Sequence, residues 1–131
     1  MIECAIKQIA YKRVQGPWGG ATISADGFMV PDGADAYAVA ISPTVSVFET
    51  ASFLTFVAAF NAVMTGMGDN DYIGVFHDDV KRTIDFNVVT VVSTTAEVDA
   101  LYAAGVQMPG GAYHFATGNG YWPQGTPSEY A

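Results

Sequence analysis

The sequence predicts an α+β domain, in which an antiparallel or mixed β-sheet carries two helices largely on one face. Two observations lead to this prediction: several short segments are rich in Val, Ile and Tyr, and only two stretches show a helical pattern. The predicted order is β-β-β-α-β-β-α-β. No repeat or linker divides residues 1–131, so we expect one domain, with residues 122–131 as an extended or loose tail.

Strands are predicted where apolar and polar residues alternate between turn signals, or where β-branched residues are dense. These segments are residues 2–11, 21–30, 36–41, 72–76, 83–93 and 112–116. The polar connection 77–82 should join its two neighbours as an antiparallel hairpin. The unit from residue 83 through the second helix to residue 116 could be a crossover that places two parallel strands in one sheet.

Both helices begin at a predicted capping box, in which a hydroxyl and a carboxylate each bind a backbone amide of the first turn. Ser46 and Glu49 form the first box, and Thr94 and Glu97 form the second. Residues 50–68 contain no charged residue. We therefore expect the first helix to be buried on nearly all sides, either in its own domain or against another copy.

Low charge content favours self-association. Half of the residues are apolar and only 14% are charged, whereas about a quarter are charged in typical chains. A small monomer of this composition has difficulty covering its surface, so we predict a homo-oligomer, with a dimer favoured. The first helix supplies the predicted interface, from a stripe of large side chains and a stripe of small ones, although internal packing of both faces is the alternative. The interface residues are Phe53, Phe56, Ala58, Phe60 and Ala62.

The charge balance excludes several classes of partner. The net charge is −8 and the chain has only five basic residues, which argues against direct binding of nucleic acids or anionic membranes. The single cysteine, Cys4, permits no internal disulfide and fits a reducing, cytoplasmic location, with its side chain in the core. Residues 50–68 include Asn61 and lack basic anchors, which argues against a membrane span.

No motif predicts catalysis or a cofactor. His77, Asp78 and Asp79 could join Asp69 and Asp71 in a cation site only if their two loops met, and their spacing matches no known metal motif, so we expect none. His114 should be a structural histidine facing away from its aromatic neighbours. The serines lack a nucleophile elbow and the glycines form no phosphate loop, so we do not expect an enzyme.

Aromatic residues beside turns are the more informative candidates, because Tyr and Trp are common anchors of binding sites. Together with two basic residues they could line a ligand pocket or a protein interface, or they could simply cover the edge of the sheet. The candidate ligand- or partner-binding residues are Trp18, Tyr113, Tyr121, Trp122, Lys81 and Arg82.

Three segments carry a resemblance to a known group of proteins. They are residues 71–79 (Asp-Tyr-Ile-Gly-Val-Phe-His-Asp-Asp) with 83–89, residues 112–118, and residues 26–30. In pattern the chain resembles small uncharacterised accessory proteins of actinobacterial phages and mobile elements, over residues 26–120. That group has no assigned activity, so no residue role follows. The chain departs from it at residues 107–111, where such proteins carry a polar turn.

The leading hypothesis is therefore a non-enzymatic accessory protein of a phage or mobile element. It would act in the host cytoplasm by protein–protein interaction, for instance by inhibiting a host or defence protein. Two alternatives remain: a protein that sequesters a small molecule such as a nucleotide signal, and a virion structural or decoration protein.

Overall fold

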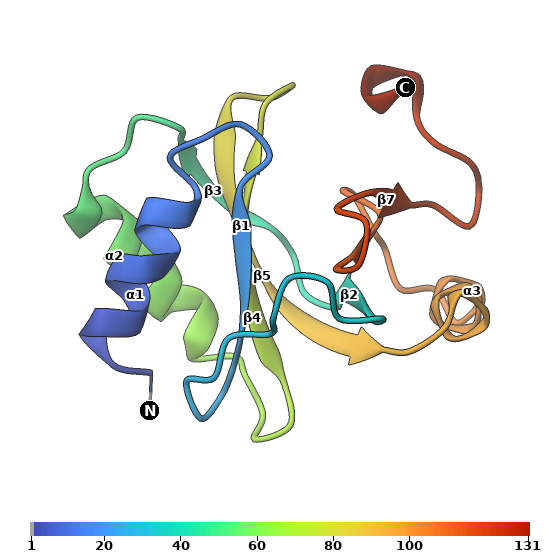
Figure 1. Cartoon of the computed structure of the whole chain (residues 1–131), viewed down its shortest axis with the longest axis horizontal. Helices are drawn as coiled ribbons and strands as arrows, with labels where there is room; N and C mark the ends of the chain where they lie inside the picture. Colours follow the sequence, from blue (N-terminus) through green and yellow to red (C-terminus); the bar gives the residue numbers. More distant parts are fainter. Residues whose placement is uncertain (1) are drawn as a thin grey trace.

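The computed structural model describes residues 2–131, which form an α+β fold with three α-helices and one seven-stranded antiparallel sheet (Figure 1). The helices are α1 (Cys4–Arg13), α2 (Phe53–Met64) and α3 (Thr95–Ala103), and a 3₁₀ turn η1 (Ser128–Tyr130) lies near the C-terminus. The strands are β1 (Gly20–Ser24), β2 (Tyr37–Ala40), β3 (Val45–Phe48), β4 (Tyr72–Asp78), β5 (Thr83–Val92), β6 (Ala112–His114) and β7 (Gly120–Tyr121). The predicted fold class is confirmed.

Strand β5 organises the sheet. The strand order is β1-β4-β5-β2-β6-β7. Both β2 and β3 pair with the edge of β5 that faces away from β4: β3 pairs with its first half and β2 with its second half. All pairs are antiparallel, so β5 and β6 run parallel to each other with β2 between them. The β4–β5 hairpin is confirmed, and so is the crossover that returns from β5 through α3 to a parallel strand.

A break between β2 and β3 bends the sheet. Ala40 pairs with Val89 and Val45 pairs with Phe86. The four residues 41–44 between β2 and β3 therefore lie opposite only two residues of β5, 87 and 88. Pro43 lies within this bulge and cannot donate to the ladder. The Ser42 hydroxyl partly replaces the lost contacts by accepting the backbone N–H of Val88. Such a bulge bends a strand and increases its twist, and β5 curves from one half of the molecule to the other (Figure 1).

The register shows that all three helices pack on one face of the sheet. Phe86 and Val88 of β5 lie opposite Val75 and Ile73 of β4, and the four join one core cluster with α1 and α2. Val39 points to the same side, because it pairs with Thr90, and it packs against Val98 of α3. On the opposite side of the sheet, here called the helix-free face, no α-helix of residues 2–131 packs.

The N-terminal segment was predicted as a strand, and this prediction is wrong. Residues 4–13 form α1, in which Ala10 is buried and Ile6 partly buried; Ile2 just before the helix and Val14 at its C-cap are buried as well, so the four positions lie four residues apart. This spacing follows one side of a helix, and the loose alternation in the sequence concealed it. Cys4 is exposed, so the prediction of a core cysteine is also wrong.

The predicted start of the first long helix is wrong as well. Ser46 lies in β3 opposite Asp85, and the α2 helix begins seven residues later at Phe53. Its N-cap is Ser52, whose hydroxyl accepts the backbone N–H of Thr55. By contrast, Thr94 is the N-cap of α3 as predicted, since its hydroxyl accepts the backbone N–H of Glu97, but the Glu97 carboxylate accepts the Thr94 hydroxyl and not a backbone amide, so only half of the predicted box forms.

One side of α2 is exposed in the single chain, so the helix is not buried on nearly all sides within its own domain, and the alternative of burial against another copy stays a prediction. Phe56 and Phe60 are fully buried in the monomer's own core, where they cannot contact a second copy. Phe53 is partly buried against the same core. Leu54 is 82% exposed, and Ala58 and Ala62, two of the predicted interface residues, are exposed with it.

Candidate functional site

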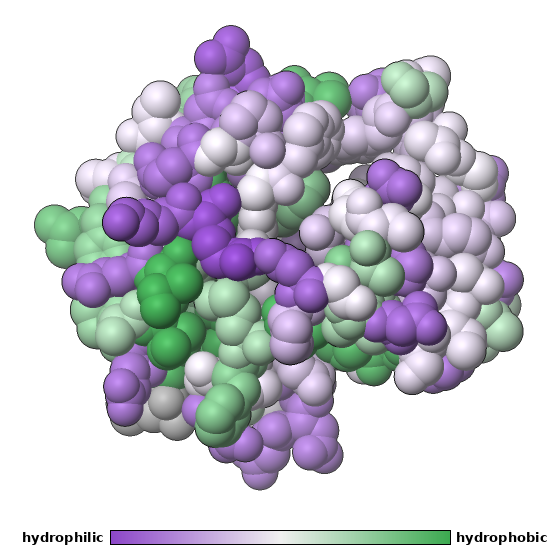
Figure 2. Space-filling model, viewed as in Figure 1, coloured by the Kyte–Doolittle hydropathy of each residue, from purple (hydrophilic) through white to green (hydrophobic). Residues whose placement is uncertain are grey.

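The helix-free face holds a cavity of about 870 Å³. Its floor is the outward side of β4 and β5, and its walls come from β1, β2, β6, the loop before β1 and the C-terminal segment. Figure 2 shows the surface recessed between the central strands and the C-terminal segment, with mostly weakly polar residues at the rim. The bend of the sheet makes the helix-free face concave and so creates this space.

Small residues keep the cavity open along its floor and walls. Gly20, Gly74, Ala38 and Ala40 all line it. A Cβ atom on Gly74 would lie only 2.6 Å from Cγ2 of Val89, and one on Gly20 only 2.7 Å from a backbone carbonyl oxygen. A larger side chain at either position would therefore displace its neighbours as well as fill the space.

Five aromatic side chains form one wall of the cavity. The Trp122 ring stacks on the Tyr130 ring, with 5.5 Å between centroids and 25° between planes. Trp18 contacts both Tyr130 and Phe76, at centroid distances of 6.3 Å and 6.0 Å. Tyr113 continues the wall 6.0 Å from Phe76. The rings come from four separate parts of the chain, so this wall depends on the complete fold.

The C-terminal segment is held against the cavity by a buried carboxylate. The Tyr130 hydroxyl donates a hydrogen bond to Oδ2 of Asp78, whose residue is only 3% exposed. Burial of the hydroxyl and its bond to Asp78 together raise the pKa of Tyr130 above its ordinary value. The tail, which the sequence predicted to be extended or loose, thus forms part of the wall.

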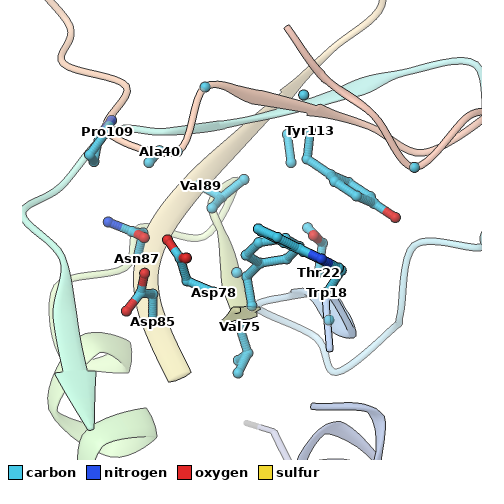
Figure 3. Close-up of a pocket in the computed structure, with 18 of the residues that line it drawn as sticks. Trp18, Thr22, Ala40, Val75, Asp78, Asp85, Asn87, Val89, Pro109 and Tyr113 are labelled. Atoms are coloured by element: carbon cyan, nitrogen blue, oxygen red, sulfur yellow. The ribbon is translucent and has the colours of Figure 1, made fainter. Parts of the chain in front are cut away.

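Acceptor groups converge on one side of the cavity. Asp78 lies opposite Thr83 at the end of the β4–β5 hairpin, so Asp85 is its diagonal neighbour on the same face, and Asn87 follows Asp85 along β5. In Figure 3 the three polar side chains lie close together on one side, whereas Trp18 and Tyr113 occupy the other. Charged and aromatic surfaces therefore face the same space.

A salt bridge lies near the Tyr113 side. The Arg13 guanidinium donates to the Asp32 carboxylate over 2.7 Å and to the carbonyl oxygen of Gly20. Burial raises the pKa of Tyr113, the Asp32 charge raises it further and the Arg13 charge opposes the change. The positive charge of Arg13 is thus already matched by a carboxylate within the same wall.

The structure brings four of the six predicted binding residues to this cavity. Trp18, Tyr113, Trp122 and Lys81 line it. Tyr121 lies on the other face of the sheet, where its hydroxyl donates to Asp99 of α3. Arg82 instead forms a salt bridge with Glu49.

Sequence reasoning missed Asp78, Asp85, Phe76 and Tyr130 as cavity residues. A usable signal was present in β5, where the polar residues Asp85 and Asn87 alternate with buried Ile84, Phe86 and Val88. Such alternation indicates that the second face of the strand is in contact with solvent or a polar site. The role of Tyr130 left no local signal, because its partner Asp78 is 52 residues away.

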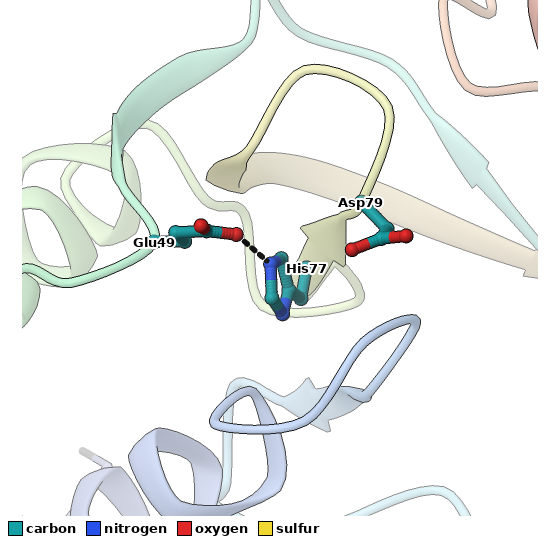
Figure 4. Close-up of side chains that lie close together, drawn as sticks. All are labelled: Glu49, His77 and Asp79. Carbon is teal, nitrogen blue, oxygen red and sulfur yellow. Dashed lines mark hydrogen bonds and ion pairs between the residues drawn. The ribbon is translucent and has the colours of Figure 1, made fainter.

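A second group of ionisable side chains, Glu49, His77 and Asp79, lies on another part of the molecule (Figure 4). His77 Nε2 lies 2.8 Å from a Glu49 carboxylate oxygen, and Nδ1 lies 2.9 Å from the carbonyl oxygen of Gly16. Because both partners are acceptors, this geometry suits a doubly protonated imidazolium. Burial alone would lower the pKa of His77, but the hydrogen bonds to Glu49 and Gly16 raise it overall.

This arrangement indicates a structural ion pair. Glu49 also binds Arg82, and the hydrogen bonds from His77 and Arg82 hold the pKa of Glu49 below its ordinary value. Both imidazole nitrogens are engaged, so neither offers a lone pair to a metal. Asp69 and Asp71 cannot join the group, because they precede the start of β4, whereas Asp78 and Asp79 lie at its other end.

His114 is also structural, as predicted. Its ring stacks on Tyr37, with centroids 4.3 Å apart and planes at 10°. Nδ1 lies 3.1 Å from the Thr117 hydroxyl and Nε2 lies 3.3 Å from the Asp35 carboxylate. The alternation of β6 places it on the opposite face from Tyr113.

Comparison of the chain with protein-family models, curated proteins and solved structures finds no match. Among residues 2–131, no helix has both the length and the apolar character needed to cross a bilayer.

Proposed function

We propose that this protein binds and sequesters a small organic molecule in the cavity on the helix-free face, without acting on it as an enzyme. The cavity itself carries the proposal. Its volume of about 870 Å³ falls in the range of about 300–1,000 Å³ that is typical of ligand sites. Aromatic walls with a few convergent polar groups are also the usual composition of such sites.

Binding without catalysis is supported by the identity of the lining residues. Among residues 2–131, the cavity wall includes neither histidine nor cysteine. Both imidazoles are engaged in structural contacts elsewhere, and Cys4 lies on α1, which packs on the other face. The nucleophile and base pairing that covalent catalysis commonly uses is therefore not assembled at this site.

Native mass spectrometry of the gently purified, untagged chain tests the proposal. We expect an additional mass of roughly a few hundred daltons per subunit, which suits a site of this size. Ala40→Phe places a ring in the cavity and should remove the additional mass. Ala62→Phe makes the same change on the exposed side of α2 and should retain it. The same additional mass on Ala40→Phe, Ala62→Phe and the unmodified chain, or no additional mass on any of the three, would contradict the proposal.

A second candidate function is protein–protein interaction, including assembly with another copy. It is supported by two exposed apolar side chains: Phe48 is 78% exposed at the end of β3, and Leu54 is 82% exposed on α2. Among residues 2–131, β3 pairs only with β5, so its outer edge can accept a further strand. The accessory role in a phage or mobile element, predicted from the resemblance, would use such a surface.

Mass measurement after gel filtration tests this second function. Leu54→Asp should convert an assembly into a 13.8 kDa monomer, because a charge would be buried at the contact. The matched variant Tyr102→Asp, on α3, should leave the assembly intact. A monomeric unmodified chain would rule out self-assembly through this surface.

A further inference from the structure

We propose that the ligand of this cavity is an organic cation, with an ammonium or amidinium group at Asp78 and Asp85 and a flat ring against the aromatic wall. This inference rests on the proposed function, because it names the chemical class that the cavity would bind. It is drawn from the unpaired acceptors on the polar side, from the charges of the wall and from its rings, while the Trp122 indole N–H in the same wall is a buried donor without a partner in the described part of the chain.

Two hydrogen-bond acceptors on the polar side, one on Asp85 and one on Asn87, have no donor among residues 2–131. Asp85 accepts the hydroxyls of Ser46 and Thr83 at Oδ1, whereas its Oδ2 has no partner among residues 2–131. Asn87 uses its side-chain N–H groups on Ser42 and Thr44, so only its carbonyl oxygen is left for a ligand. A ligand that satisfies these oxygens must donate hydrogen bonds.

The charges of the cavity wall also favour a cationic ligand. Asp32, Asp78 and Asp85 line the cavity, against Arg13 and Lys81. Arg13 is paired with Asp32, and Lys81 is exposed on the β4–β5 turn. The net charge of −8 adds a field over the whole surface that attracts cations and repels phosphates and carboxylates.

The aromatic wall is suited to a cation with a ring. The faces of Trp and Tyr attract cations within about 6 Å through the quadrupole of the ring, and they also stack on flat groups. Trp18, Phe76 and Tyr113 line the same space as the two carboxylates. One ligand can therefore contact both surfaces, which neither a simple metal ion nor an uncharged hydrocarbon would do.

Tyr130 occupies part of the charged site. Its hydroxyl donates to Asp78 Oδ2, while Oδ1 accepts the backbone N–H groups of Val80 and Lys81. A ligand cation at Asp78 must share or replace this hydroxyl. Removing the hydroxyl should therefore leave Asp78 more available and strengthen cation binding.

Isothermal titration calorimetry with three indoles tests the inference. Tryptamine, 3-methylindole and indole-3-propionate share one ring and are cationic, neutral and anionic. We expect tryptamine to bind at least tenfold more tightly than either of the others, since charge-assisted hydrogen bonds are about twice as strong as neutral ones. Tightest binding of indole-3-propionate or 3-methylindole would overturn the organic-cation inference and leave the proposed function standing.

Single substitutions test whether tryptamine binds at the carboxylates of the cavity. Asp85→Asn should weaken tryptamine binding about tenfold, whereas Asp69→Asn removes the same charge at an exposed loop outside the cavity and should have less than a twofold effect. Tyr130→Phe should strengthen tryptamine binding severalfold. Circular dichroism establishes that each variant is folded. Equal effects of Asp85→Asn and Asp69→Asn would overturn the inference, because binding would then reflect only net charge.

Failure of the proposed function gives a different result. If Ala40→Phe binds all three indoles as the unmodified chain does, the cavity is not the site and both proposals fail. If Ala40→Phe abolishes binding of an anionic or neutral indole that the unmodified chain prefers, only the organic-cation inference fails.

Discussion

Replacing Phe56 by alanine tests whether the α2 helix stabilises the monomer or serves mainly as an interface. Phe56 is fully buried, and its ring centroid lies 5.1 Å from those of Tyr11 and Phe86 and 6.1 Å from that of Phe60. Truncating a buried Phe costs about 3–5 kcal/mol. This is a large share of the roughly 5–15 kcal/mol by which domains are stable.

The expected loss in the free energy of unfolding corresponds to a change in melting temperature. An unfolding entropy of about 2.1 cal/mol/K per residue amounts to about 0.28 kcal/mol/K for 131 residues. Phe56→Ala should therefore lower Tm by roughly 11–18 °C. Leu54→Ala, on the exposed side of the same helix, should change the free energy of unfolding by no more than about 0.5 kcal/mol.

Urea denaturation at two protein concentrations measures both variants. We expect a large loss for Phe56→Ala that does not depend on protein concentration. Similar losses for Phe56→Ala and Leu54→Ala would refute the argument. A loss for Phe56→Ala that disappears at high concentration would also refute it, because the ring would then act between copies.

Three further predictions concern other parts of the molecule. Glu49→Gln should lower the pKa of His77 in an NMR titration, because the Glu49 carboxylate helps to raise that pKa. In the unmodified chain, the stabilisation from the His77–Glu49 pair should be lost as the pH rises through the pKa of His77, and also as the pH falls through the pKa of Glu49. Ser52→Ala should speed hydrogen exchange at the Thr55 amide, through loss of a cap worth about 1 kcal/mol. Tyr130→Ala should shift tryptophan fluorescence to longer wavelength, because both tryptophan rings contact Tyr130.

Each of these predictions has a specific contradiction. An unchanged His77 pKa in Glu49→Gln would mean that the ion pair is absent in solution. Exchange at Thr55 that responds to Ser46→Ala instead of Ser52→Ala would restore the helix start predicted from the sequence. A fluorescence shift of equal size in Tyr102→Ala, on α3, would show that the response is not specific to the cavity wall.

Local signals in the sequence were sufficient for much of the second half. Thr94 and Glu97 identify the start of α3 because a cap depends on residues three apart. The β4–β5 hairpin follows from two β-rich segments around a short polar turn. These interactions are close in the sequence, so their patterns need no knowledge of the tertiary structure.

Errors arose where long-range contacts decide the structure. Ser46 and Glu49 match a capping box, but Ser46 pairs with Asp85 in the sheet and Glu49 binds His77. In the N-terminal segment, the spacing of Ile2, Ile6 and Ala10 fits a helix, whereas loose alternation suggested a strand. Tertiary packing selected between patterns that the sequence alone left ambiguous.

The cavity was only partly predictable for a related reason. Trp18, Tyr113 and Trp122 were identified because aromatic residues beside turns are unusual enough to attract attention. The space they enclose depends on the bend at Pro43 and on small residues on one face of the sheet, such as Gly74. Neither feature has meaning until the strand register is known.

The most direct test of the binding cavity is a map of amide chemical-shift changes in a two-dimensional ¹H–¹⁵N NMR spectrum as tryptamine is added. We predict that the largest changes fall on residues of the helix-free face, including Thr22, Phe76 and Val89, and that α2 amides such as those of Ala58 and Ala62 remain unchanged. Changes confined to α2 and β3, or spread evenly over the acidic surface, would contradict a binding site in this cavity.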